Sequence, residues 1–145
     1  MRKFNIVIND PHFHEIHHAL GCPWPEEIIG ETYRNYFAVD ADSETARRFR
    51  ASPHWTNGTD KFGMSSFSVT DEGRAALLAF IRENIEVPRR YMITFRRYDE
   101  SKIVAAKSRS AAKYAAYLDA DIDWPFMEYA AEIKSVRIYS PCCLP

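Results

Sequence analysis

The clearest pattern in the chain is a change from alternating to helical spacing of apolar residues near its middle. Apolar and polar positions alternate at residues 67–69, as in a half-buried strand. A helix is predicted to begin after Thr70, whose hydroxyl can accept hydrogen bonds from first-turn N–H groups. Its apolar face is formed by Leu77, Leu78, Ile81 and Ile85. Pro88 ends the pattern, because proline clashes with the preceding turn and lacks an N–H group.

The residues before this helix predict a series of short elements. They are a strand at 3–9, a helix from Pro11 to about Leu20 capped by Asp10, an extended segment at 33–39 and a helix at 43–51 capped by Asp42. Residues 52–61 read as a loop with a turn at Asn57-Gly58. This loop is either the tip of a wing-like hairpin or a separate connection.

The residues after Pro88 predict a different arrangement. The predicted elements are strands at 91–98 and 102–107, a helix capped by Ser108, a short helix capped by Asp123 and a strand at 136–139. Alternation places Tyr91, Ile93 and Phe95 on the core face of the first strand. The apolar stripe of the first helix is predicted at Ala111, Tyr114, Ala115 and Leu118.

These patterns predict an α+β protein of two units, a helical N-terminal unit at residues 1–88 and a ββααβ unit at residues 89–145. The two units either stay separate or pack as one body. The segment VTDEGRAAL, residues 69–77, resembles the passage from wing to helix in winged-helix domains. The resemblance implies a winged-helix-like arrangement in the N-terminal unit.

Composition is that of a folded protein. The 145 residues are 46% hydrophobic and 14% aromatic, with a net charge of −1. The charge is uneven: residues 1–88 hold nine Lys+Arg and 13 Asp+Glu, and residues 89–145 hold ten and seven. The basic second part hints at an anionic partner.

Several features predict a cytoplasmic protein of a bacterial host, with no membrane partner. The N-terminus has no apolar run of signal-peptide length, and no apolar run is long enough to span a bilayer. The three cysteines are an odd number, and Cys142 and Cys143 are adjacent, so a disulfide framework is not expected.

Three segments resemble small uncharacterised proteins encoded by phages and prophages. They are HALG at 18–21, YRNYF at 33–37 and VTDEGRAAL at 69–77, and the segment SRSAAKYAAYLDA at 108–120 is similar as well. The resemblance implies a mobile-element origin and an accessory role. Blocking a host defence, as an anti-CRISPR does, and regulating transcription are two such roles.

The sharpest chemical motif is H-E-x-x-H at residues 14–18, a pattern that binds zinc through two histidines one helical turn apart. Trp24 stands where a third ligand would follow in metzincins. A histidine-rich helix without catalysis is therefore favoured, with His14 and His18 as candidates for adventitious metal binding. No catalytic residue and no cofactor is predicted, and a zinc hydrolase ranks last among the functions considered.

A basic stretch at residues 89–113, interleaved with Tyr91, Phe95 and Tyr98, is a candidate nucleic-acid surface. Its candidate contacts are Arg89, Arg90, Arg96, Arg97, Lys102, Lys107 and Arg109. The alternative is a solvated sheet face whose aromatic side chains point into the core and whose arginines pair with acidic residues of the first half of the chain.

Loop aromatics form a third candidate site. Trp24, Tyr33, Tyr36 and Trp55 are either interface anchors for a host protein complex or covers of a small core. The leading hypothesis is a non-enzymatic protein that inhibits a host defence system by binding a host macromolecule. The alternative is a DNA-binding regulator that uses the basic stretch.

Overall fold

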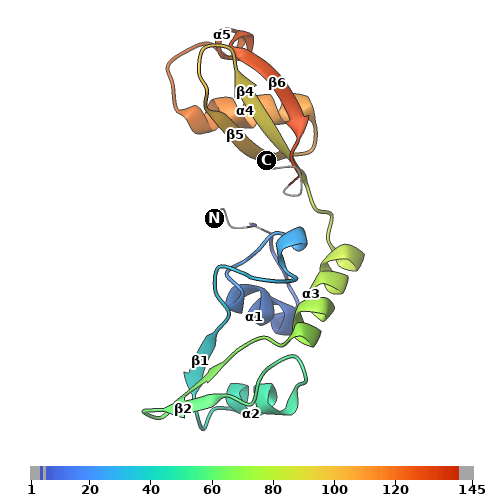
Figure 1. Cartoon of the computed structure of the whole chain (residues 1–145), viewed down its shortest axis with the longest axis vertical. Helices are drawn as coiled ribbons and strands as arrows, with labels where there is room; N and C mark the ends of the chain where they lie inside the picture. Colours follow the sequence, from blue (N-terminus) through green and yellow to red (C-terminus); the bar gives the residue numbers. More distant parts are fainter. Residues whose placement is uncertain (1–3, 5, 141–145) are drawn as a thin grey trace. The chain divides into compact units, whose positions relative to one another are not determined.

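The computed structural model describes residue 4 and residues 6–140, and shows a mixed helix and sheet protein of the α+β class. The chain divides into two compact units, Met1–Glu86 and Val87–Pro145. Each unit contains one three-stranded antiparallel sheet with its own helices (Figure 1).

The N-terminal unit is built around a sheet of strand order β1-β3-β2. Its elements are α1 (Pro11–Ala19), the 3-10 helix η1 (Pro25–Glu27), β1 (Phe37–Asp40), α2 (Glu44–Ala51), β2 (Thr59–Lys61), β3 (Met64–Phe67) and α3 (Asp71–Asn84). β3 pairs antiparallel with both neighbours, and α1 packs on α3.

Capping side chains set the starts of the three α-helices described in this unit. The predicted caps of α1 and α3 are confirmed: Asp10 accepts from the Phe13 N–H group and Thr70 from the Gly73 N–H group. The prediction for α2 was wrong by one residue, because Ser43 rather than Asp42 caps it, by accepting from the Ala46 N–H group.

The hairpin of β2 and β3 turns at Phe62-Gly63, so of the two alternatives for the loop with Asn57-Gly58 the hairpin tip is wrong, and Asn57-Gly58 lies in the connection that precedes β2. Phe62 and Gly63 have φ angles of 53° and 76°, and two successive positive angles suit a two-residue hairpin. Gly58 has another role, because a Cβ atom there would lie 2.7 Å from the Phe67 ring. The last part of the loop predicted at residues 52–61 is the strand β2 (Thr59–Lys61).

The first residues do not form the predicted strand where they are described, at residue 4 and residues 6–9. The Phe4 N–H group donates to the Cys22 carbonyl, and the Phe4 side chain is buried. The extended segment predicted at 33–39 is a strand only from Phe37 onward.

Stacked aromatic rings form the core between α2 and the sheet. Phe49 and Trp55 stack with ring centroids 3.9 Å apart, and Phe67 meets Phe49 edge-on at 5.2 Å. All three are buried, and Leu77 and Ile81 of α3 are buried too.

The C-terminal unit has the strand order β5-β4-β6, with β4 antiparallel to both neighbours. Its elements are β4 (Arg89–Phe95), β5 (Ser101–Ala106), α4 (Arg109–Ala120), α5 (Phe126–Ala131) and β6 (Ile133–Ile138). Figure 1 shows α4 lying across one face of the sheet, and it packs against all three strands.

The core of this unit confirms the predicted inner face of β4. The predicted apolar stripe of the helix that covers this face, α4, was wrong in part. Tyr91 and Ile93 are buried, together with Ala112 and Ala116 of α4, and with Tyr129 and Ile133. Within the predicted stripe of α4, Tyr114 and Leu118 are 51% and 59% exposed. Alanine faces the sheet instead, because a small side chain allows the helix to approach the large side chains of β4.

Two further boundaries differ from the prediction. α5 begins directly after Pro125 with no side-chain cap, so Asp123 does not cap it. β6 begins at Ile133 rather than at residue 136, and a register shift at Thr94/Phe95 accommodates its pairing with β4. Lys134 and Ser135 therefore lie on an edge strand.

Candidate functional site

The face of the C-terminal sheet opposite to α4 carries polar and flexible side chains. Met92 of β4 pairs with Ile103 of β5 on one side and with Arg137 of β6 on the other. Successive residues of a strand point to opposite faces, so these side chains lie opposite the buried Tyr91 and Ile93. Among the described residues of the C-terminal unit, α4 packs on the face of Tyr91 and Ile93 and not on this open face (Figure 1).

A hollow of about 460 Å³ lies on the open face. It is lined by Met92, Thr94, Phe95, Tyr98, Asp99, Glu100, Lys134, Ser135 and Arg137. The hydroxyls of Thr94 and Ser135 are hydrogen bonded to each other at 2.5 Å. The hollow thus combines thioether and aromatic surface with two cations and two carboxylates.

A second hollow of about 250 Å³ lies between α4 and β6. It is lined by Arg109, Ser110, Lys113, Ile133, Lys134, Ser135 and Val136. Lys134 and Ser135 line both hollows, so the two adjoin along β6.

Three residues of the predicted basic stretch have bonding partners within the C-terminal unit. Arg96 caps the C-terminal end of α5, because its main-chain N–H donates to the Glu132 carbonyl at 2.8 Å and its Nε to the Ala131 carbonyl at 3.2 Å. Arg97 pairs with the Glu132 carboxylate at 3.2 Å. Lys102 pairs with Asp119 at 2.9 Å. These side chains have internal partners, as the alternative predicted, but the acidic partners Glu132 and Asp119 belong to the second part of the chain and not to the first.

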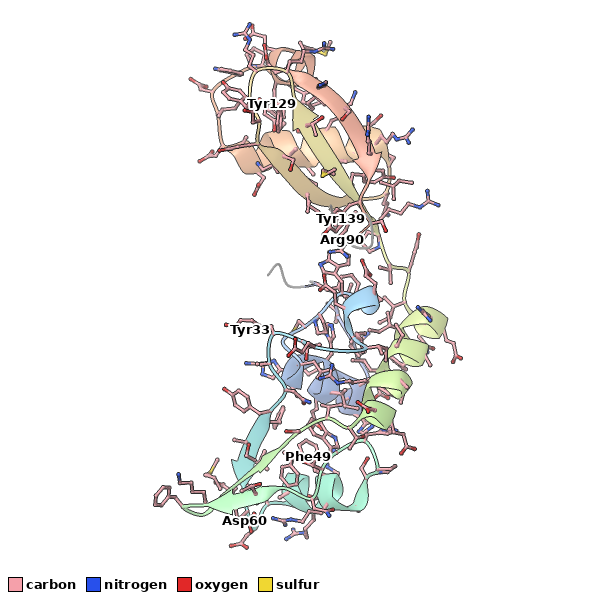
Figure 2. The ribbon with its side chains drawn as sticks, in the orientation of Figure 1. Tyr33, Phe49, Asp60, Arg90, Tyr129 and Tyr139 are labelled. Carbon is pink, nitrogen blue, oxygen red and sulfur yellow. The ribbon has the colours of Figure 1, made fainter. Side chains whose placement is uncertain are left out.

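The other four residues of the stretch have different surroundings. The Arg90 guanidinium lies 4.9 Å from the centre of the Tyr139 ring (Figure 2). Burial lowers the pKa of Arg90 from its ordinary value, and Tyr139 opposes this shift. Arg89, Lys107 and Arg109 are exposed, and of the seven candidates Arg109 lines a hollow described above.

The sequence reasoning missed Lys134 and Arg137. Both lie on β6, whose predicted start at residue 136 excluded Lys134 from a strand. Their positions follow from the pairing of β6 with β4, which places Arg137 beside Met92. The available signal was the pair of basic residues in IKSVRI, which lies outside the basic stretch at residues 89–113.

The four aromatic candidates fall into two pairs. Trp24 and Trp55 are 7% and 3% exposed and belong to the core, Trp24 against Phe4 and Trp55 against Phe49. Their large rings fill the core of the N-terminal unit, so these two residues do not form an exposed binding surface. Tyr33 and Tyr36 are 73% and 55% exposed, and Figure 2 shows Tyr33 on the outside of the N-terminal unit.

The H-E-x-x-H segment lies on α1 with its two terminal histidines on one face. The rings of His14 and His18 stack with centroids 6.4 Å apart. Glu15 pairs with Arg48 at 3.1 Å. Among the described residues, no group of three or more His, Cys, Asp or Glu side chains could hold a metal ion.

Two other histidines of α1 face inward. His17 is buried, and its Nε2 atom lies 3.0 Å from the Pro23 carbonyl. The His12 Nε2 atom lies 2.7 Å from Nδ1 of His54, an imidazole pair that the sequence did not reveal. Burial lowers the pKa of both His12 and His17, and His54 lowers that of His12 further.

Comparison with known proteins gives no match: no family model, no curated protein and no solved structure is similar to this chain. Of the helices in the described part of the chain, none is long and apolar enough to cross a membrane.

Proposed function

We propose that this protein binds nucleic acid through its C-terminal unit. The observation that carries the proposal is the pair of hollows that adjoin along β6. Basic side chains line both of them, and Lys134 is common to the two. The proposal moves the candidate surface from residues 89–113 to the two sides of β6.

The two hollows supply different parts of nucleic-acid recognition. Lysine and arginine contact phosphates, whereas aromatic and thioether side chains pack against exposed bases. Tyr98 and Met92 provide such surface beside Arg137 and Lys134. The carboxylates of Asp99 and Glu100 can accept hydrogen bonds from base amino groups. Because the bases of a single strand are open to stacking, single-stranded nucleic acid fits this surface better than a duplex does.

We also propose that the N-terminal unit has a winged-helix-like arrangement. Support comes from the β2–β3 hairpin, which is followed directly by α3. A helix-turn-helix reader needs two consecutive helices, the second in the major groove. Here α2 stands between β1 and the hairpin, so we assign nucleic-acid contact to the C-terminal unit instead.

Fluorescence anisotropy with labelled oligonucleotides tests the proposal. We expect single strands to bind more tightly than duplexes, and affinity to fall steeply with salt. The double variant Lys134→Ala/Arg137→Ala should weaken binding by about tenfold or more, since charge-assisted hydrogen bonds are worth about 1.5–3 kcal/mol each. It should also lower the salt slope by about 0.7 for each lost phosphate contact.

Arg89→Ala is the matched control, because Arg89 is exposed and lines neither of the two hollows. It removes a positive charge from the same unit and should change affinity by less than about twofold. Equal losses in the control and in the double variant would show an unspecific charge effect and contradict the proposal.

A second candidate function is the binding of a host protein, the inhibitor role that the sequence resemblance implies. The observation that favours it is the exposure of Tyr33 and Tyr36, with Ile29 also 56% exposed. The test is a tagged pull-down from bacterial lysate after nuclease treatment. A discrete protein retained by the wild type and lost with Tyr33→Ala/Tyr36→Ala supports this candidate, and retention of none contradicts it.

A further inference from the structure

The hollow between α4 and β6 gathers three cations from two elements that lie far apart in the sequence. Arg109 and Lys113 are four residues apart on α4, so they lie on the same side of the helix. Lys134 reaches the same hollow from the edge strand β6. A volume of about 250 Å³ is enough for a phosphate group together with part of the sugar that carries it.

No carboxylate lines this hollow, although the unit pairs its cations elsewhere. Arg97 and Lys102 have ion-pair partners, whereas no ion pair to Arg109, Lys113 or Lys134 occurs among the described residues. Three like charges around one cavity repel each other, and an anion in the cavity relieves that repulsion. The arrangement therefore selects an anion with more than one negative charge.

Hydrogen-bond donors complete the site. Ser110 lines the hollow, and its hydroxyl can donate to an oxyanion. Ile133 and Val136 provide apolar wall, where charge-assisted hydrogen bonds are less weakened by water. The donors come from both sides of the hollow, so they can reach different oxygens of one tetrahedral group.

We infer that this hollow binds the terminal phosphate of a nucleic-acid strand, and the inference rests on the proposed function. A phosphate ester at a strand end carries close to two negative charges at neutral pH, whereas each internal phosphodiester carries one. Three cations without a carboxylate match the terminal group better. The adjoining hollow on the open face then receives the nucleotides next to that end.

The test compares oligonucleotides of one sequence that carry a 5′-phosphate, a 3′-phosphate or hydroxyls at both ends. We expect one of the two phosphorylated ends to bind about tenfold tighter than the hydroxyl form, as expected for one or two charge-assisted hydrogen bonds. The end that gains affinity identifies the source of the phosphate. Inorganic phosphate at millimolar concentration should reduce the difference.

Lys113→Ala should remove this preference, because Lys113 lines the hollow between α4 and β6 and not the hollow on the open face. Lys113→Arg, which keeps the charge, should retain most of it. Lys107→Ala is the control, since Lys107 is exposed and lines neither hollow. Thermal melting of each variant shows whether the fold is kept.

The outcomes separate this inference from the proposed function. Oligonucleotides that bind equally well with and without a terminal phosphate would overturn the inference and leave nucleic-acid binding in place. A preference that survives Lys113→Ala would place the phosphate elsewhere and also overturn it. If no oligonucleotide binds, the proposed function itself fails.

Discussion

The two units use their basic side chains in different ways. In the N-terminal unit arginines bind within the unit: Arg48 pairs with Glu15, and Arg50 pairs with Asp60, a residue labelled in Figure 2. The buried Arg74 donates to the Ile28 carbonyl at 2.8 Å. In the C-terminal unit, three cations converge on a hollow without a carboxylate.

The two units also differ in how their cores are enclosed. The N-terminal unit encloses stacked aromatic rings between its sheet and α2, whereas the C-terminal sheet has helices packed on one face and hollows at the other face and along β6. A residue pattern alone does not separate a structural cation from a binding one. The presence of an acidic partner in space does: Arg48 and Arg50 each have one, whereas no ion pair to Arg109, Lys113 or Lys134, the cations of the proposed binding site, occurs among the described residues.

The largest effect is expected for Phe49→Ala, which removes the ring between Trp55 and Phe67. Truncating a buried phenylalanine costs about 3–5 kcal/mol, because the cavity collapses only in part. Hydrogen exchange followed by mass spectrometry should show lost protection over residues 1–86 and retained protection over residues 87–145. Equal loss in both units would contradict the division of the core. Tyr36→Ala, at an exposed aromatic, is the control and should change stability little.

Arg74→Met tests the structural use of cations. The substitution keeps much of the side-chain volume but leaves the Ile28 carbonyl without its charged donor, and it also removes a bond to the Thr32 hydroxyl. An unsatisfied buried acceptor costs about 1–3 kcal/mol, which urea unfolding can measure. Arg82→Met on the same helix is the matched control, because Arg82 is exposed. Similar losses in both variants would show that helix propensity, not the buried bond, is responsible.

Local signals in the sequence were sufficient for the helix starts. The caps at Asp10 and Thr70 depend on residues within one turn of each other, so the sequence alone predicts them. The strand β2 was missed because TDK is polar and exposed, and its place depends on pairing with β3.

The face of α4 could not be predicted from spacing because alanine occurs on more than one side of the helix. The larger side chains of Tyr114 and Leu118 indicated a core face, but the bulk of Tyr91 and Ile93 across the interface favours alanine there.

The candidate site was predictable only in part, because its residues come from separate segments. Arg109 was named from the basic stretch, whereas Lys134 joins it only through the position of β6 beside α4. Arg97 and Lys102 looked equivalent to Arg109 in the sequence. Their partners, Glu132 and Asp119, lie 35 and 17 residues further along the chain.

Acidification should weaken the N-terminal unit more than the C-terminal unit. His12 and His17 have lowered pKa values in the folded protein, chiefly through burial. The unfolded chain therefore binds protons more readily than the folded one, and stability falls as pH drops below the ordinary histidine pKa of about 6.5. Asp10 and Glu15 raise the pKa of His12 and so reduce the loss of stability. His54 and Arg48 lower the pKa of His12 further and so increase that loss.

Thermal melting at pH 7.5 and pH 5 measures this loss, and hydrogen exchange assigns it to residues 1–86. His17→Gln, whose side-chain amide can still donate to the Pro23 carbonyl, should be less sensitive to pH than the wild type. His14→Gln is the control on the exposed side of α1. A melting temperature that is unchanged between the two pH values would contradict the prediction.

The smallest expected effects on stability concern two helix caps of the same type. Thr70 and Ser108 each accept a hydrogen bond from an N–H group in the first turn of their helices, α3 and α4. Replacing either residue by alanine should cost about 1 kcal/mol. The Thr70 hydroxyl also donates to the Pro53 carbonyl at 2.7 Å, so Thr70→Ala should cost more than Ser108→Ala. Urea unfolding of the two variants measures the difference, and Thr70→Ser, which keeps both hydrogen bonds, should recover most of the loss. If Ser108→Ala were the more destabilising change, the extra bond that ties α3 to the rest of its unit would contribute nothing.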